Sequence, residues 1–381
     1  MRAESVVLVQ AAVPDYRSGF LLEFDRRLGS RLQIVAGRCH FDQTVRTSDE
    51  ASSRAELVHN VYFFGRRLLW QRRTLKPGVA ADVAILEMNP RILSVWMTLL
   101  VRRLLGRRSV LWGHAWPRRG RESPTEALRR PMRRLADAIV VYTQKEADEL
   151  GSRLAGRLVI AAPNALYRAD DIKAGSVAES KDFIYVGRLV PSKKPELLIR
   201  AFAKIAPATA GSRLIVVGDG PLRPALELCV EALSLEDRVC FEGHVSDRAE
   251  LSHLYRRALA SVSPGYVGLS ATQSFSFGVP MIIADDEPHA PEIGAAREGF
   301  NTRFFRSGDI DALADTLREV HLARHRWSSQ RNRIAEACRL EYSTERMVEG
   351  FMIACFGTRS EELSIGQPGA RVRSTLEERR R

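Results

Sequence analysis

The sequence has few cysteines, and they do not form a recognisable metal or redox pattern. Five cysteines are scattered along 381 residues and no CxxC pair occurs, whereas zinc sites and redox motifs depend on such close spacing. We expect reduced thiols, mostly in the core of a cytoplasmic protein. They are Cys39, Cys229, Cys240, Cys338 and Cys355.

Long apolar runs are also missing. The longest, residues 93–101, is far shorter than the roughly 20 residues of a membrane-spanning helix, so it predicts a buried helix. The N-terminus enters a strand-like run at residues 6–12 without a signal-peptide layout. We therefore expect a cytoplasmic protein, soluble or peripheral to the inner face of a membrane.

Acidic residues are scarce in one region of a basic chain with net charge +12. Residues 102–134 contain eleven arginines and two glutamates, Glu122 and Glu126. No zinc-finger spacing, RNP-like strand or basic heptad region accompanies this charge, so no nucleic-acid partner is expected. The block suits contact with an anionic membrane or a phosphate-bearing acceptor. An arginine-rich solvated face is the alternative.

Strand-like runs alternate with helix-like segments through most of the chain, which predicts an α/β fold with two doubly wound, Rossmann-like domains. Helices are expected at residues 222–233 and 310–322. The expected strands are residues 6–12, 32–36, 82–86, 109–112, 138–142, 158–161, 183–186, 214–217, 239–241, 260–263 and 281–284.

A polar segment at residues 168–181 is the candidate linker between the two domains. The domains are then residues 1–167 and 182–341. Residues 358–381 are rich in charge and expected to be disordered.

The second domain begins with a strand, a tight turn and several cations. The run 183–186 ends at Gly187, Arg188 follows, and Lys193 comes after a Pro-Ser turn, just before a helical pattern. Amide donors and cations converging after a strand make a good anion site. Taken alone, the segment is better explained as a solvated basic turn.

Four further turns occur in the second domain, three after strands and the last before a strand, and their order is informative. They are GDGP at residues 218–221, EGHV at residues 242–245, a glycine-rich loop at residues 263–269 and GVP at residues 278–280. With the GRLVPSKK turn, this order resembles the C-terminal half of the family 4 glycosyltransferases. Those are retaining, metal-independent enzymes with the two-domain GT-B fold.

The resemblance is close over about residues 183–320 and assigns roles to particular residues. It implies that Arg188 and Lys193 hold the diphosphate of a nucleotide sugar and stabilise the leaving group. The remaining donor contacts would come from Gly187, Gly218, Gly220, Gly243, Gly268, Leu269, Gln273 and Glu292. For Glu292, a helix-start glutamate that complements the helix dipole is an equal alternative.

The glycine-rich loop departs from the family pattern. The family carries two glutamates eight residues apart, at the positions of Gly265 and Gln273 in this chain. Gln273 retains hydrogen-bonding capacity for a ribose hydroxyl, but Gly265 offers no side chain. A sugar contact at that position must come from backbone amides or from elsewhere.

The first domain supplies candidates for acceptor binding. Tyr16 and Arg17 follow the first strand in a P-x-Y-R segment like the family's acceptor loop. His114, a candidate acid–base or sugar-positioning residue, follows the fourth strand between Trp112 and Trp116, which could stack on a sugar or lipid. A last helix at residues 342–357 is expected to pack back onto this domain.

The residues therefore predict a glycosyltransferase with a nucleotide sugar as donor and a glycan or lipid-linked acceptor, without a cofactor. No Asp-x-Asp segment follows a strand, so no metal is expected. A non-catalytic relative that binds nucleotide or a partner transferase stays open, because both loop glutamates are replaced. A nucleotide-sugar epimerase with the same fold is a further alternative.

Overall fold

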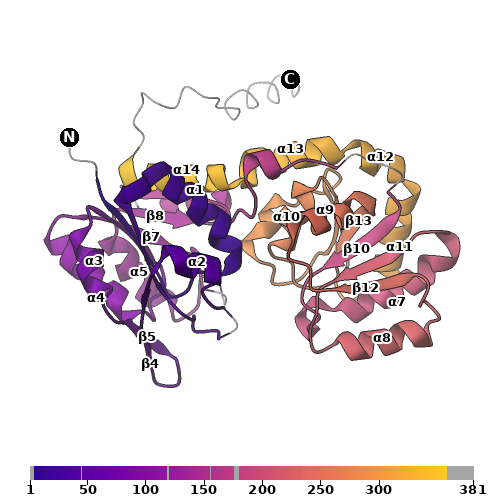
Figure 1. Ribbon diagram of the computed structural model, residues 1–381, viewed down its shortest axis with the longest axis horizontal. Helices are drawn as coiled ribbons and strands as arrows, with labels where there is room; N and C mark the ends of the chain where they lie inside the picture. Colours follow the sequence, from indigo (N-terminus) through magenta and orange to yellow (C-terminus); the bar gives the residue numbers. More distant parts are fainter. Residues whose placement is uncertain (1–3, 44, 118–119, 155, 176–179, 358–381) are drawn as a thin grey trace.

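Two lobes, each built on a parallel sheet, make up the protein (Figure 1). This computed structural model describes residues 4–43, 45–117, 120–154, 156–175 and 180–357. The predicted disordered segment, residues 358–381, lies outside the described residues, as does part of the predicted linker.

The first sheet has seven parallel strands in the order β3-β2-β1-β6-β7-β8-β9. This is the doubly wound order, in which the chain starts in the middle, moves to one edge and then returns to the other side. The strands are β1 (Val6–Gln10), β2 (Leu32–Gly37), β3 (Glu56–Val58), β6 (Val83–Glu87), β7 (Arg108–Trp112), β8 (Ala138–Val141) and β9 (Leu158–Ala161).

The second sheet repeats the same winding with six parallel strands, in the order β12-β11-β10-β13-β14-β15. The predicted fold class, two doubly wound α/β domains, is therefore confirmed. The strands are β10 (Asp182–Val186), β11 (Leu214–Val217), β12 (Val239–Gly243), β13 (Ala258–Ser263), β14 (Met281–Ala284) and β15 (Thr302–Phe305).

Both sheets are buried on both faces because apolar residues occupy successive strand positions. In β1, Leu8 packs into one core cluster and Val7 and Val9 into the cluster on the opposite face. Helices cover these faces, as parallel sheets require. In the first lobe they are α1 (Ser18–Leu28), α2 (Asp49–Arg54), α3 (Leu75–Ala80), α4 (Leu93–Leu104), α5 (Glu126–Leu135) and α6 (Gln144–Gly151).

The helices of the second lobe follow the same arrangement, except that the last one returns to the first lobe. Helix α14 packs against α1, β8 and β9, and its Phe351 lies 4.9 Å from the ring of Trp112. The helices are α7 (Pro195–Ile205), α8 (Arg223–Ala232), α9 (Arg248–Arg257), α10 (Ser270–Ser276), α11 (Ile310–Leu322), α12 (Arg324–Ser329), α13 (Arg331–Tyr342) and α14 (Thr344–Phe356).

The structure corrects three expectations. Helix α4 is buried on one face only, since Leu100 and Leu104 are exposed. Only Cys338 and Cys355 are fully buried among the cysteines. Strands β3 and β15 and an antiparallel hairpin of β4 (Asn60–Phe63) and β5 (Leu68–Gln71) were not expected.

Most described arginines of the predicted basic block are bonded within the protein. Arg102 is fully buried and donates to the carbonyls of Gly78, Ala81 and Asp82, and burial lowers the pKa of Arg102 to about 10. Other members bond to backbone carbonyls or to glutamates: Arg107, Arg108, Arg121, Arg129 and Arg133. The block therefore mainly joins elements of the first lobe.

No helix in the described ranges combines the length and apolar composition needed to span a bilayer.

Candidate functional site

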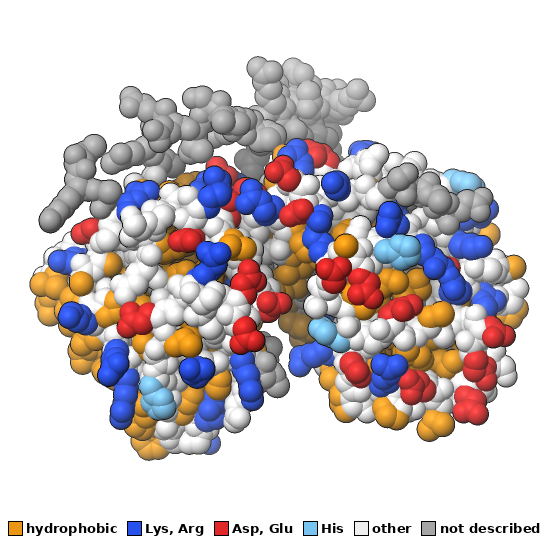
Figure 2. Space-filling view, viewed as in Figure 1, with side chains coloured by type: hydrophobic (Ala, Val, Ile, Leu, Met, Phe, Trp, Pro, Cys, Tyr) orange, Lys and Arg blue, Asp and Glu red, His pale blue; other side chains and the backbone are white. Residues whose placement is uncertain are grey.

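The candidate site lies where the carboxyl ends of both sheets approach each other. In a doubly wound sheet, ligands bind where the strand order reverses, here between β1 and β6 and between β10 and β13. The lobes meet near these ends, since the Asn164 amide donates to the Glu292 carboxylate at 2.8 Å. Figure 2 shows the surface hollowed between the lobes.

Three of the predicted turns pack directly on one another beyond the second sheet. Gly187 donates to the Val217 carbonyl, and Gly218 donates to the Gly243 carbonyl. A Cβ added to Gly218 would stand 1.9 Å from the Gly187 carbonyl oxygen, and Gly218 has a left-handed φ of +134°. Only glycine permits this approach, so the GDGP turn braces the Gly187 turn.

The two cations of the Gly187 turn occupy different environments. The Arg188 side chain is exposed, and its guanidinium has no hydrogen-bond or ion-pair partner in the part of the chain that the structure describes. The Lys193 ammonium donates to the Tyr266 carbonyl at 2.7 Å and lies 4.7 Å from the Tyr266 ring. Burial, together with the charge of Arg188, lowers the pKa of Lys193 to about 8. An anion would find one free cation and one partly desolvated cation here.

The turn that carries Lys193 fills the space beside Gly265, the position that the family resemblance aligns with a loop glutamate. A Cβ on Gly265 would stand 2.5 Å from the Ser192 carbonyl oxygen and 2.9 Å from the Lys193 carbonyl carbon. Tyr266 also donates to the Ser192 carbonyl at 3.0 Å. A larger residue at 265 would have to displace this backbone, so the glycine matches the packing of the loop.

Gln273, the counterpart of the second glutamate, is bonded within the protein. Its amide nitrogen donates to the Tyr167 hydroxyl at 3.1 Å, and its amide oxygen accepts from the Tyr255 hydroxyl at 3.5 Å. A ribose contact by Gln273 would have to share or replace these bonds.

His289, which was not among the predicted site residues, holds the glycine-rich loop in place. Its Nδ1 accepts from the Val267 amide at 3.0 Å, and its Nε2 donates to the Ala284 carbonyl at 2.8 Å. Burial lowers the pKa of His289, and so does Lys193. The neutral ring therefore holds the loop that precedes Gly268 in place. A Cβ added to Gly268 would stand 3.6 Å from the Cβ of Ala290.

The predicted acceptor residue Arg17 is held firmly beyond β1. Its guanidinium donates to the Gln10 amide oxygen at 2.6 Å and to the Tyr142 hydroxyl at 3.4 Å, and lies 4.2 Å from the Trp112 ring centre. Tyr16, beside it, is partly exposed. Burial alone would lower the pKa of Arg17, but Tyr16 and Tyr142 outweigh that effect, and the pKa is raised above its usual value.

Glu87 is a further ionisable residue at this switch point, and it was not among the predicted site residues. It ends β6, accepts from the Ala11 amide at 3.1 Å and pairs with His40 Nε2 at 3.1 Å. Burial would raise the pKa of Glu87, but His40, Ala11 and Arg17 bring it below its usual value. The strand order places Glu87 next to the β1 end, and only that order reveals it.

His114 is exposed, whereas Trp116 is packed among arginine side chains of the first lobe. The exposed His114 ring lies 4.7 Å from the Tyr142 ring, which connects it to Arg17. Trp116 is surrounded by the guanidinium groups of Arg121, Arg133 and Arg153 at 5.1 to 5.2 Å. The ring of Trp116 is therefore packed by the first lobe itself.

Trp112 does not stack on a ligand, contrary to expectation. It is 2% exposed and packs against Phe20 and Phe351 in the core.

In the described residues no group of three His, Cys, Asp or Glu side chains converges in a way that could hold a metal ion.

The second lobe is similar in sequence to a known family. Residues 168–340 match the family model "Glycosyl transferases group 1".

Two curated relatives are similar over shorter segments. An exopolysaccharide phosphotransferase of Streptomyces coelicolor is 29% identical over 48% of this chain and 19% of its own length. A GDP-mannose-dependent phosphatidylinositol dimannoside mannosyltransferase of Mycobacterium tuberculosis is 32% identical over 26% of each chain. The chain thus spans about a fifth to a quarter of these relatives.

A solved structure extends the similarity to both lobes. Anabaena Alr3699/HepE in complex with UDP aligns with 91% of this chain and 98% of its own, with a TM-score of 0.66 and 14% identity. At that identity the comparison supports the fold alone.

Proposed function

We propose that the chain is a retaining glycosyltransferase that transfers a sugar from a nucleotide-diphosphate sugar to a glycan or lipid-linked acceptor. The observation that carries the proposal is the convergence of the Arg188–Lys193 turn with the Gly218 turn and the Gly265 loop at the switch point of the second sheet. Oriented amides and two cations at that position suit a diphosphate.

The two cations also suit the chemistry of sugar transfer. As the bond between the anomeric carbon and the diphosphate oxygen breaks, the electron pair leaves with the diphosphate, whose charge grows. Arg188 and Lys193 would stabilise that charge more in the transition state than in the ground state. This is why we propose a reaction that does not depend on a metal ion.

The acceptor would bind the first lobe near Arg17, Tyr16 and His114. Its hydroxyl oxygen forms the new bond to the anomeric carbon, and in a front-face reaction the leaving diphosphate takes its proton. No carboxylate is assigned as a covalent nucleophile. Retention of configuration and the front-face course follow from the family resemblance.

UDP and GDP sugars are both candidate donors. HepE was crystallised with UDP, and the mycobacterial relative is described as GDP-mannose-dependent. Because the named relatives act on an exopolysaccharide and a phosphatidylinositol glycan, we infer a role in surface polysaccharide or glycolipid synthesis at the cytoplasmic membrane face.

Replacement of both loop glutamates motivates a second candidate, a non-catalytic or partner-dependent relative that binds nucleotide or a partner transferase. Gly265 packs closely against Ser192 and Lys193, which supports a well-packed loop whose residues differ from the family pattern. A nucleotide-sugar epimerase remains the third candidate and would need no acceptor.

Turnover of UDP-glucose and GDP-mannose, with and without an octyl-glycoside panel as model acceptors, tests the proposal. We expect acceptor-dependent release of UDP or GDP that Arg188→Ala abolishes. Arg318→Ala removes a partly exposed arginine of α11 that pairs with Asp315 and is the matched control. Nucleotide binding without any turnover would favour the non-catalytic relative, and an isomerised sugar nucleotide without acceptor would favour the epimerase.

A further inference from the structure

One face of helix α4 presents apolar side chains to solvent. The exposed residues Leu93, Met97, Leu100 and Leu104 follow one another at intervals of four, three and four, which places them in a single stripe. The opposite face, which includes Leu99, is buried in the lobe. Leu104 is 86% exposed, so the stripe has no partner within the described chain.

Two features next to α4 also present apolar side chains: the β4–β5 hairpin and a hollow between α3 and α4. The tip of the β4–β5 hairpin exposes Phe63 and Phe64, the latter at 77%, and β5 packs on α4. Figure 2 shows orange side chains along the outer edge and lower tip of the first lobe, with blue ones between them.

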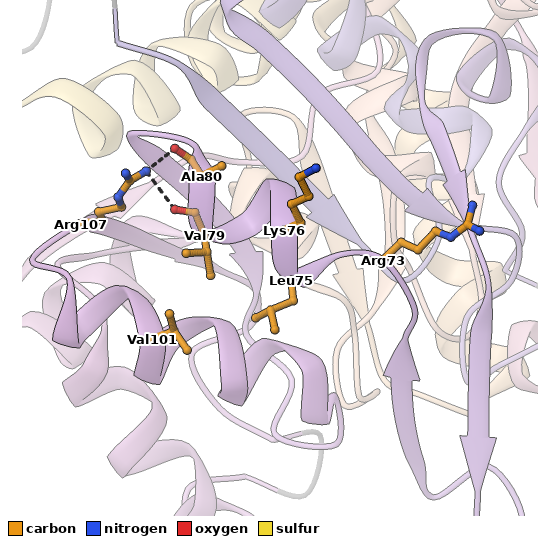
Figure 3. Close-up of a pocket in the computed structure, with 7 residues that line it drawn as sticks. All are labelled: Arg73, Leu75, Lys76, Val79, Ala80, Val101 and Arg107. Atoms are coloured by element: carbon orange, nitrogen blue, oxygen red, sulfur yellow. Dashed lines mark hydrogen bonds between the residues drawn. The ribbon is translucent and has the colours of Figure 1, made fainter.

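A shallow hollow of about 620 Å³ lies between α3 and α4. In Figure 3, Leu75 and Val101 lie between the two helices, while Arg107 points to the carbonyls of Val79 and Ala80. The hollow is therefore apolar inside, and cationic residues stand around it.

The charge around the face has one sign. Residues 60–81 and 88–121 contain no aspartate or glutamate. Arg73, Lys76 and Arg103 are exposed, and none of their side chains has a hydrogen-bond or ion-pair partner among the described residues. Unlike the arginines that bond within the lobe, these cations are free to meet an external anion.

We propose that the α4 face, formed by α3, α4 and the β4–β5 tip, docks on a bilayer that contains anionic lipids. Apolar side chains would enter the interface while Lys76, Arg73 and Arg103 meet lipid phosphates, a combination that supports peripheral binding. A second copy of the chain fits less well, because a two-fold contact of the face with itself would bring its cations together.

The inference deepens the proposed function, since it would hold the acceptor-binding lobe at a surface that carries lipid-linked acceptors. Its test does not depend on that function, because vesicle binding is measured without donor or acceptor. Loss of transfer with normal vesicle binding would overturn the enzyme proposal alone.

Flotation with phosphatidylcholine vesicles, with and without one quarter phosphatidylglycerol, tests the inference on the full chain. The first variant is Leu100→Gln with Leu104→Gln, and the second is Lys76→Gln with Arg103→Gln. Leu228→Gln with Leu322→Gln is the matched control, because these leucines are 65% and 71% exposed on the second lobe. Melting temperatures within about 2 °C of the parent would establish that the variants fold.

We expect the parent and control to float with the anionic vesicles and much less with the neutral ones. The leucine pair should weaken the anionic partition about tenfold or more, and the cation pair about fivefold per charge at low salt. Equal or absent binding of the parent to both vesicles would overturn the inference. So would a leucine pair that binds like the control, or a concentration-dependent dimer that this pair abolishes.

Discussion

Gly265 packs directly against the backbone of Lys193: a Cβ on Gly265 would stand 2.9 Å from the Lys193 carbonyl carbon. Real Cβ atoms do not approach backbone so closely, so the glycine-rich loop and the cationic turn are packed as one unit. A side chain at position 265, such as the glutamate that the family resemblance aligns there, would collide with this backbone.

Gly265→Glu, which restores the family residue, should therefore damage this chain. The added side chain must displace the Ser192–Lys193 backbone, and overpacking of this kind costs about 1–3 kcal/mol. Gly268→Ala is the control, since its Cβ would meet nothing closer than 3.6 Å. Urea unfolding would show the difference, and a Gly265→Glu protein as stable as Gly268→Ala would contradict the packing argument.

The lowered pKa of Lys193 predicts that diphosphate binding weakens in mild alkali. The pKa of about 8 leaves Lys193 largely charged at pH 7 and largely neutral at pH 9, whereas a terminal phosphate, whose second pKa is about 6, is mostly ionised at both. If binding requires the charged lysine, affinity falls about tenfold per pH unit above that pKa.

Titration calorimetry of UDP and GDP at pH 7, 8 and 9 measures this effect. Lys193→Arg should bind with little pH dependence, because arginine stays charged throughout. A parent affinity that does not change between pH 7 and 9, or an unchanged pH dependence in Lys193→Arg, would show that Lys193 does not hold the diphosphate.

Glu292 should tune the same titration. It is 5% exposed, and its charge raises the pKa of Lys193 against the larger effects of burial and Arg188. Glu292→Gln preserves the shape and an acceptor for the Asn164 amide, so the midpoint of the affinity loss should move to lower pH. An unmoved midpoint in the same calorimetric series would separate Glu292 from Lys193.

Glu87 should stabilise the first lobe in a pH-dependent manner. Its pKa is below the usual value in the folded state, so the folded state binds fewer protons than the unfolded state around that value. The stabilisation is present above the unfolded pKa, about 4.3, and is lost as pH falls through the folded pKa.

Glu87→Gln leaves Arg17 without that charge and should lower the free energy of unfolding by about 1–3 kcal/mol at pH 7. The deficit should be smaller at pH 3.5, which lies below the unfolded pKa of about 4.3, because the charge-dependent stabilisation decreases as the pH falls below that value. A deficit that is equal at both pH values would mean that shape, and not charge, accounts for the effect.

The sequence predicted the two-domain fold because strand-length apolar runs alternate with helical segments, and the strands are buried on both faces. Residues such as Phe183 and Ile184 pack on opposite sides of the second sheet. Three strand-like features were not predicted: β3 has only three residues, β15 contains Arg303 among its four residues, and the β4–β5 hairpin turns through left-handed Phe64, Gly65 and Arg66.

Turns with glycine or cations after a strand could be identified as donor-site candidates because local sequence determines them. The partners that act across space could not. His289 contacts a loop that is 22 residues away in the sequence, and Glu87 pairs with His40 across 47 positions. Whether another element covers the outer face of α4 also depends on tertiary packing. Those relationships depend on strand order and packing.

The most direct test is the melting temperature of the protein with UDP, GDP, UDP-glucose and GDP-mannose, all at one concentration, set at a hundred times the dissociation constant of the ligand that the parent binds most tightly. One nucleotide family should stabilise the parent and Arg318→Ala by about 2.7 kcal/mol, a rise of several degrees. Arg188→Ala and Lys193→Ala should lose most of that rise. If no nucleotide shifts the parent, or if both variants shift as far as the parent, Arg188 and Lys193 do not form a nucleotide-sugar site.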